Sequence, residues 1–266
     1  MLTDALIGML RPYHFRGKMR VLGGLAPPSG EHRAKVFGYD VDLDLGEAIQ
    51  RWIYLGAFEP KETEMARAWL RPGMTFVDVG ANFGYFTLLA ASRVLPEGRV
   101  FALEPSPYAH ARLARTLEAN GLTHIELLQA GLSSAPGRLN LYLPPSGFHS
   151  PTMSENSGGQ PVEVPVLTLD DCLDEWGVDR VDLIKIDVEG HELRVVDGAA
   201  NALSSGRIRA VLIEFNDYWL RQQGTSPREL YDRLAAAGFV DVEGEGRFEH
   251  DGVDTRFLVH RSARSS

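Results

Sequence analysis

The chain has 266 residues and a formal net charge of −9, and its length suits one domain, or one domain with an appendage. The acidic balance argues against nucleic acid or an anionic membrane as the main partner, because both attract a positively charged surface. The chain has a single cysteine, Cys172, which cannot form an internal disulfide. It has no basic region before its first apolar stretch and no apolar run of membrane-spanning length. These features predict a cytoplasmic protein without a membrane span.

The N-terminal segment, residues 1–70, is the least regular part of the chain. It is expected to be partly helical, with a helix over residues 59–73, and it suits contacts with substrate or with a second copy in a homodimer. After it, strand and helix patterns alternate. The expected strands are residues 74–79, 99–104, 125–130, 180–190 and 209–215, and the expected helices are residues 83–95, 106–121, 191–206 and 226–238.

Two further pairs of segments interrupt or follow this alternation. Residues 138–144 and 162–169 alternate apolar and polar side chains, which predicts an antiparallel pair around a turn-rich loop, residues 145–160. Residues 239–248 and 255–261 predict a terminal hairpin. The whole pattern indicates an α/β fold with a mostly parallel sheet and helices on both faces.

Carboxylates stand where the predicted parallel strands end. Ligands of such sheets bind at the carboxyl ends of the strands. Four of the five strands end in an acid, namely Asp78, Glu104, Asp187 and Glu214. An acidic rim suits a ligand that carries hydroxyls, amines or positive charge.

The stretch TFVDVGANFGYFTLLAA, residues 75–91, contains a glycine-rich turn between the first strand and its helix. Dinucleotide-binding turns use three glycines to approach a pyrophosphate. Here Asn82 takes the middle glycine position and Asp78 stands before the turn, where its charge would repel a pyrophosphate and attract an ammonium or sulfonium. Glu104, about twenty residues on, can accept both hydroxyls of a ribose. The cofactor predicted from these groups is S-adenosylmethionine rather than NAD.

Three motifs, RWIYLGAFEPKETEMARAWLRPGMTFVDVGANFGYFTLLAA, FALEPSP and VDLIKIDVEGHEL, resemble the FkbM family of S-adenosylmethionine-dependent methyltransferases. The resemblance runs from about residue 51 to residue 215. It implies a class I methyltransferase (Rossmann-like) fold, with a seven-stranded sheet whose last strand is antiparallel, in a domain over residues 71–266 with an insertion at about 133–167. It also implies O-methylation of a hydroxyl on a sugar, small molecule or secondary metabolite. The cofactor-binding residues it implies are Glu59, Asp78, Gly80, Ala81, Asn82, Gly84, Glu104, Pro105, Ser106, Gly131, Leu132 and Asp187.

A second cluster lies in LIKIDVEGHE, residues 183–192. Lys185 falls inside a buried strand and needs a partner, for which Asp78, Glu104 and Glu214 are candidates. Asp187, Glu189 and His191 follow at intervals of two and face the same way if the backbone stays extended. If Gly190 ends the extension, His191 instead falls in the first turn of the next helix. The candidate catalytic residues are Lys185, Asp187, Glu189, His191 and Glu214.

Two mechanisms fit these residues. In the first, His191 or Asp187 accepts the proton as a hydroxyl attacks the cofactor's methyl group in line. In the second, Asp187 and Glu214, with Glu189, bind a divalent metal, for which magnesium suits the oxygen ligands better than zinc. We favour the metal-free mechanism because no repeated Asp-rich ligand motif accompanies these acids.

The sequence also contains weaker candidates for acceptor contacts, and it leaves alternative functions open. His149 on the turn-rich loop could close over substrate, Tyr218 could contact an acceptor, and Trp219 and Cys172 are expected in the core. The alternatives to an O-methyltransferase are a nicotinamide-dependent oxidoreductase, which Asp78 disfavours, and a non-catalytic cofactor-binding protein. A nucleic-acid methyltransferase is disfavoured because no aromatic and basic stripe is visible.

Overall fold

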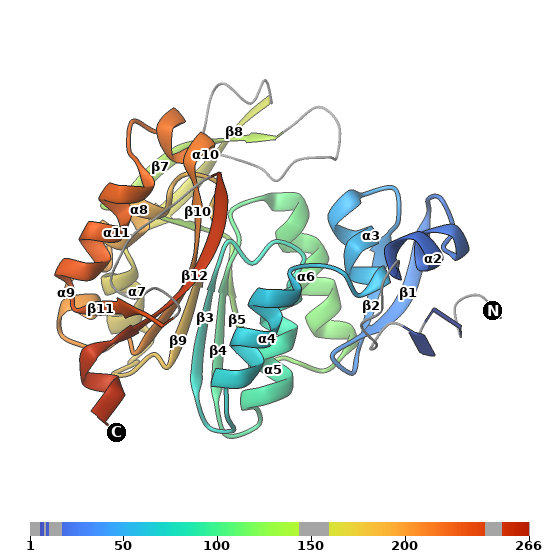
Figure 1. Cartoon of the computed structure of the whole chain (residues 1–266), viewed down its shortest axis with the longest axis horizontal. Coiled ribbons are helices and arrows are strands. Elements are labelled where there is room, and N and C mark those ends of the chain that lie inside the picture. Colours follow the sequence, from blue (N-terminus) through green and yellow to red (C-terminus); the bar gives the residue numbers. More distant parts are fainter. Residues whose placement is uncertain (1–5, 8, 11–17, 144–159, 243–251, 266) are drawn as a thin grey trace.

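The computed structural model describes residues 6–7, 9–10, 18–143, 160–242 and 252–265. Its centre is a seven-stranded sheet in the order β11-β12-β10-β9-β3-β4-β5 (Figure 1). The strands are β3 (Thr75–Val79), β4 (Arg99–Leu103), β5 (Glu126–Leu128), β9 (Leu183–Ile186), β10 (Ala210–Asn216), β11 (Phe239–Asp241) and β12 (Val253–His260). The five strands from β5 to β10 are parallel, and β12 is antiparallel to both of its neighbours. The predicted mostly parallel sheet with a C-terminal antiparallel hairpin is confirmed.

Helices cover both faces of this sheet (Figure 1). One face carries α4 (Pro60–Trp69), α5 (Tyr85–Val94) and α6 (Pro107–Ala119), and the other carries α7 (Leu169–Glu175), α8 (Glu192–Asp197), α9 (Ala200–Ser204) and α11 (Pro227–Ala236). The strands are apolar on both sides, as a sheet buried between two layers requires. Phe76 and Val77, neighbours on β3, belong to two different hydrophobic clusters, one on each face.

The helix predicted over residues 191–206 is wrong in one respect, because it is divided into α8 and α9. Gly198 lies between the two, and a Cβ atom there would stand 2.0 Å from the carbonyl oxygen of Ser133. This backbone contact comes from a distant part of the chain, so helical periodicity alone does not show it. The short α10 (Asp217–Gln222) follows β10 directly, and a 3₁₀ turn, η2 (Arg261–Ser265), ends the described chain.

The insertion forms its own three-stranded sheet in the order β6-β8-β7. Its strands are β6 (Gly131–Leu132), β7 (Gly137–Leu143) and β8 (Gln160–Leu167). β7 and β8 are antiparallel, as predicted, while β6 runs parallel to β8. Residues 144–159, which include most of the predicted turn-rich loop and His149, lie outside the described residues.

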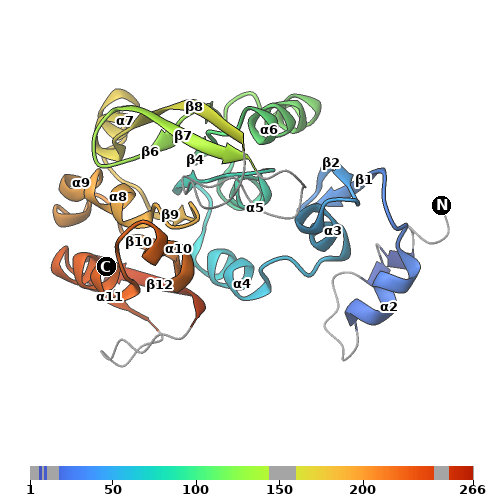
Figure 2. The same ribbon diagram turned by 90° about the horizontal axis from the view of Figure 1, so that it is seen from above.

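The N-terminal segment contains α2 (Lys18–Leu25), an antiparallel hairpin of β1 (Glu31–Val36) and β2 (Tyr39–Asp44), and α3 (Ala48–Leu55). The helix predicted over 59–73 is α4, which begins with Pro60 in its first turn. Figure 2 shows α2, the hairpin and α3 beyond α5, on the side away from β12. Leu43 and Ile53 share one hydrophobic cluster with Leu88 and Leu113 of α5 and α6. In the described part of the chain, no helix is long and apolar enough to cross a bilayer.

Candidate active site

A cavity opens where β3, β4 and β9 end, and α3 and the residues Phe58 and Glu59 before α4 supply another part of its wall. Most residues that the sequence predicts for the site line this one cavity. They are Glu59, Asp78, Gly80, Ala81, Asn82, Glu104, Pro105, Gly131, Leu132, Lys185, Asp187, Glu189, His191 and Glu214. Gly84 and Ser106 do not line it. Tyr218 is exposed and Trp219 is half-buried, and both lie outside its lining.

The glycine turn after β3 is packed against the end of β9. Gly80 has φ +79°, and a Cβ atom there would lie 2.0 Å from the carbonyl oxygen of Asp187. Gly84 also has a positive φ, but its added Cβ would meet the side chain of Leu113 on α6 at 2.2 Å. Gly80 therefore lets the turn pack closely against the end of β9, whereas Gly84 serves the packing of α6.

Two buried carboxylates flank the turn. Asp78 is 1% exposed, and its Oδ2 accepts a 2.6 Å hydrogen bond from the Thr87 hydroxyl. Burial raises the pKa of Asp78, while Lys185 and the Thr87 hydrogen bonds oppose the rise. Asp78 lines the cavity, where its carboxylate would attract a cationic ligand group.

Glu104 connects the glycine turn to the start of α6. One carboxylate oxygen accepts the backbone N–H of Asn82 and the other that of Ser106, both at 2.7 Å. Burial raises the pKa of Glu104 to about 7, against the effect of these N–H groups. Each oxygen keeps a second lone pair, so both can still accept a hydroxyl. The Ser106 side chain instead accepts the N–H of Ala109 as the predicted cap of α6.

Lys185 is paired, but its direct partners differ from those predicted. Its ammonium lies 2.7 Å from Asp187 Oδ2 and 3.8 Å from Glu59 Oε2, and 4.6 Å from the centre of the Phe86 ring. Asp187 is two residues along an extended backbone, which places it on the same side as Lys185. Asp78, which is opposite Lys185 in the strand register, acts on it through its charge. Burial lowers the pKa of Lys185, but these acids outweigh it and raise the pKa above its usual value.

Glu59 brings the N-terminal segment into this charged cluster. It precedes α4 with φ +37°, an uncommon conformation for a residue with a side chain. Burial raises its pKa to about 7, while Lys185 lowers it. The sequence predicted Glu59 near the site by resemblance alone. The structure gives a physical reason, because Glu59 lines the cavity and lies beside the ammonium of Lys185.

The chain leaves the extended conformation after Asp187. Glu189 has φ +51° and Gly190 φ +99°, so His191 starts α8, and the second of the two predicted arrangements is observed. His191 is 5% exposed, with Nε2 3.1 Å from the Ser133 hydroxyl and Nδ1 without a partner in the described structure. Burial lowers its pKa to about 4. The imidazole is therefore neutral at pH 7 and keeps an unused ring nitrogen.

Glu192 is a residue of the site region that the sequence analysis missed. It is fully buried, and its Oε1 accepts the backbone N–H groups of Val188 and Gly190. Its Oε2 has no partner among the described residues, and burial raises its pKa to about 7. From sequence, this acid could not be told from an ordinary charged residue at a helix start. It holds the turn that presents Val188 and Glu189 to the cavity.

Glu214 on β10 is a further strongly perturbed acid of the cavity. Its Oε2 has no partner in the described part of the chain, and burial, followed by Asp187, Glu189 and Glu192, raises its pKa to about 9. Within the described residues, no group of three or more His, Cys, Asp or Glu side chains is arranged to hold a metal ion. Cys172 is buried and its pKa is raised to about 12, as suits a core thiol.

These pKa values predict that the stability of the ligand-free protein falls as the pH rises from 7 to 9. Folded Glu104, Glu192 and Glu59, each with a pKa of about 7, and Glu214, with a pKa of about 9, keep protons that the unfolded chain releases near pH 4.5. Stability therefore falls from about pH 4.5 upward, and above pH 7 the decline comes mainly from Glu214. The lowered pKa of His191 acts in the opposite direction, but only between about 4 and 6.5.

Urea unfolding at pH 7, 8 and 9 measures this decline, and a Glu214→Gln variant should show a smaller one because its amide does not ionise. Glu118→Gln, a change at an exposed residue of α6 outside the cavity lining, is the control and should keep the wild-type slope. A wild-type stability that stays constant or increases over this range would contradict the assignment.

Comparison with known proteins gives one family. A model described as "Methyltransferase FkbM domain" matches residues 78–240. The methyltransferase sdnD of Sordaria araneosa is 34% identical over 46% of this chain and 59% of its own length. The 31-O-demethyl-FK506 methyltransferase FkbM of Streptomyces tacrolimicus is 33% identical over 56% of this chain and 67% of its length. The hexuronic acid methyltransferase AglP of Haloferax volcanii is 28% identical over 60% of this chain and 61% of its length.

The match thus spans less than two thirds of the length of sdnD and AglP. Among solved structures, a methyltransferase FkbM from Methylobacillus flagellatus superposes with a TM-score of 0.48 and 16% identity, over 97% of this chain and 58% of that one. The matched segment begins at Asp78 and includes the glycine turn, Glu104 and the whole LIKIDVEGHE motif. The N-terminal part of the cavity wall, from α3 to Glu59, lies outside it.

Proposed function

Because the chain belongs to the FkbM methyltransferase family, we propose that it transfers a methyl group from S-adenosylmethionine to a hydroxyl of a small molecule or saccharide. The observation that carries this proposal is the pair of buried carboxylates beside the glycine turn that lines the cavity. Asp78 and Glu104 flank that turn, and Gly80 keeps it close to β9. When bound, S-adenosylmethionine supplies a methyl group activated by a positively charged sulfur.

The residues present fit that cofactor better than a dinucleotide. The cavity lining contains six carboxyl groups, whereas Lys185, the lysine among its described residues, is already paired with Asp187 and Glu59. A pyrophosphate in the glycine turn would therefore face negative charge without a free cation. An ammonium and a sulfonium would be attracted there, and Glu104 has lone pairs left for ribose hydroxyls.

Names of relatives support a hydroxyl as the acceptor. The S. tacrolimicus relative is named for methylation at an oxygen, and a 2-O-methyltransferase NoeI of Sinorhizobium fredii is 27% identical over 66% of this chain. We assign proton removal from the acceptor to His191, because its imidazole is neutral at pH 7 and its Nδ1 is unused. In this assignment Ser133 accepts the N–H of the other ring nitrogen and fixes the tautomer. Asp187, held by Lys185, then serves to position ligand groups.

Calorimetric titration with S-adenosylmethionine and S-adenosylhomocysteine tests the cofactor assignment. Asp78→Asn and Glu104→Gln should each lower affinity about tenfold or more, because each replaces a carboxylate oxygen that faces the cavity with an amide N–H₂ group. The amide introduced by Glu104→Gln would also turn an N–H₂ group toward a backbone donor. Asp182→Asn is the matched control, since Asp182 is 3% exposed and bonded to Thr75 N but does not line the cavity.

Folded wild-type protein that binds neither ligand would contradict the proposal, and fluorescence titration with NADH would then test the oxidoreductase alternative. The base is tested in the same series by His191→Asn. This variant should keep its affinity for S-adenosylhomocysteine and lose turnover in an acceptor screen, carried out with and without magnesium. Cofactor binding by wild type without turnover on any acceptor would favour the non-catalytic alternative.

A further inference from the structure

One side of the cavity is built by α3, which lies outside the segment that the family model matches. Ile49, Trp52 and Ile53 of α3 line the cavity, and positions spaced three and four residues apart share one face of a helix. Asp78, the first matched residue, comes twenty-five residues after Ile53. This wall therefore comes from the N-terminal segment, before the residues that the family model matches.

Trp52 differs from its neighbours on this helix. Ile53, Tyr54 and Leu55 are at most 4% exposed, whereas Trp52 is 48% exposed. In the described structure its ring stacks on no other ring, and its indole N–H donates to no group. A large aromatic surface left open in the wall of a cavity is available to contact a ligand.

The helix that carries Trp52 is held firmly by the hairpin. Gln50, the side chain next to Ile49, is fully buried, and its Oε1 accepts the backbone N–H of Asp44 at 2.8 Å. Gly56 ends the helix in the left-handed conformation and donates to Ile53 O. The position of α3 is therefore set by the position of β2.

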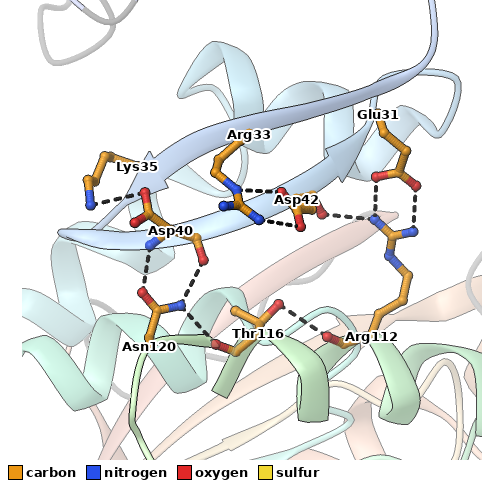
Figure 3. Close-up of polar contacts among 8 residues, drawn as sticks. All are labelled: Glu31, Arg33, Lys35, Asp40, Asp42, Arg112, Thr116 and Asn120. Atoms are coloured by element: carbon orange, nitrogen blue, oxygen red, sulfur yellow. Dashed lines mark hydrogen bonds and ion pairs between the residues drawn. The ribbon is translucent and has the colours of Figure 1, made fainter. Parts of the chain in front are cut away.

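The hairpin is in turn fixed to α6, as Figure 3 shows. Arg112 donates to both carboxylate oxygens of Glu31, at 2.8 and 3.1 Å, and to the Asp42 carbonyl at 2.8 Å. Asn120 accepts the N–H of Asp40 and donates to its carbonyl. Since α6 begins just after Glu104, the contacts of the hairpin with α6 also fix the position of Trp52 relative to Glu104, the carboxylate proposed to bind ribose. Such a preorganised wall loses little entropy when a ligand binds.

The rest of the lining shows what kind of ligand fits beside Trp52. The cavity also presents Asp187, Glu189 and Glu214, whose oxygens accept hydrogen bonds from hydroxyls. A pyranose ring combines a flat face of C–H groups with hydroxyls around its edge. We propose that Trp52 is the specificity-determining residue for the acceptor and stacks on the C–H face of a pyranose ring. This inference rests on the proposed methyl transfer to a hydroxyl.

The competing ligand for Trp52 is the adenine of the cofactor. Adenine is expected at Gly131 and Leu132, which form the insertion's β6 and line the cavity too. A Trp52 that contacts adenine would affect cofactor affinity, whereas a Trp52 that contacts the acceptor would not. This difference separates the two assignments experimentally.

The test is saturation-transfer NMR on protein saturated with S-adenosylhomocysteine, with methyl hexopyranosides and methyl hexuronides as probes and the linear polyol sorbitol as comparison. We expect transfer to the ring C–H protons of at least one pyranoside and weaker transfer to sorbitol. Trp52→Ala should weaken pyranoside binding about tenfold, and Trp52→Phe should weaken it less, because a ring remains. Tyr218→Ala, a change at an aromatic residue that is 58% exposed outside the lining, should leave binding unchanged.

Each other result overturns the proposal. If Trp52→Ala binds pyranosides like wild type, Trp52 is not a stacking surface for the acceptor. The same follows if wild type binds none of them while it is saturated with S-adenosylhomocysteine. A loss of S-adenosylhomocysteine affinity in Trp52→Ala assigns Trp52 to the cofactor instead. Wild-type protein that does not bind S-adenosylhomocysteine at all marks a failure of the proposed function, which the calorimetric titration shows separately. Because Trp52 is half exposed, its replacement should leave the melting temperature nearly unchanged, and that measurement accompanies each variant.

Discussion

A Gly80→Ala variant should lose detectable binding of S-adenosylmethionine and should be less stable than wild type by about 3 kcal/mol or more. The added Cβ atom would lie 2.0 Å from the carbonyl oxygen of Asp187 and 3.3 Å from Val188 Cγ1. The first of these contacts is with backbone, which cannot rotate away as a flexible side chain would. The φ of +79° adds a further penalty of about 1–2 kcal/mol for a residue with a Cβ.

The turn also has no room to shift toward the other side. The N–H groups of Gly80 and Ala81 both donate to the carbonyl of Leu103 at the end of β4, each at 3.0 Å. Moving the turn away from β9 would break these bonds and would displace Asn82 from Glu104. The clash therefore falls on the same groups that are proposed to hold the cofactor, which is why stability and binding should be lost together.

Gly121→Ala separates the clash from the backbone conformation. Gly121 follows α6 with φ +66°, and an added Cβ there would meet nothing within 4 Å. It should lose only about 1–2 kcal/mol and keep full cofactor affinity. Urea unfolding and calorimetry on both variants give the two quantities. If Gly80→Ala were no less stable than Gly121→Ala and bound the cofactor normally, the close packing of the glycine turn on β9 would be wrong.

The parts of the fold that the sequence predicted are those set by local chemistry. Ser106 and Pro107 predicted the start of α6, and the structure shows Ser106 capping the helix and Pro107 in its first turn. The apolar runs of the parallel strands predicted burial on both faces, because side chains alternate between two helical layers. The acids at strand ends meet in one cavity for the same reason, since parallel strands end at one edge of the sheet.

The parts that could not be predicted depend on contacts between distant residues. The β1–β2 hairpin is fixed to α6 by Arg112, which reaches Glu31 across 81 positions of sequence. Glu192 is an acid near a helix start, and nothing in the local sequence shows that the turn before it folds back onto its carboxylate. The left-handed conformation of Glu189 likewise follows from tertiary packing, because a residue with a side chain does not favour it.

Lys185→Met should destabilise the protein by about 3–5 kcal/mol, since it removes one partner of a buried ion pair and leaves the other charged. The Lys185 side chain is 6% exposed and sits between Asp187 at 2.7 Å and Glu59 at 3.8 Å. Its charge also acts on Asp78. Methionine fills a similar volume and can still pack against Phe86, so the loss would come from charge rather than from a cavity.

The loss in Lys185→Met should depend on pH in a defined direction. Lys185 lowers the pKa of Glu59 and of Asp78, so without it both carboxyl groups hold protons more tightly in the folded state. A folded-state pKa raised above the unfolded value makes stability fall as the pH rises through that interval. The difference between variant and wild type should therefore be larger at pH 8 than at pH 5, when unfolding is measured in urea at both values.

Lys35→Met is the control, because it removes the lysine of a solvent-exposed ion pair. Lys35 pairs with Asp40 at 3.0 Å, a shorter contact than that between Lys185 and Glu59, but the two side chains are 67% and 44% exposed. Solvent screens such a pair, so its removal should change stability by less than about 1 kcal/mol. A Lys185→Met protein no less stable than Lys35→Met, or a loss that does not change with pH, would show that the carboxylates around Lys185 do not depend on its charge. The expected result would instead make Lys185 the residue whose charge offsets the crowding of Asp78, Asp187 and Glu59 in one buried site.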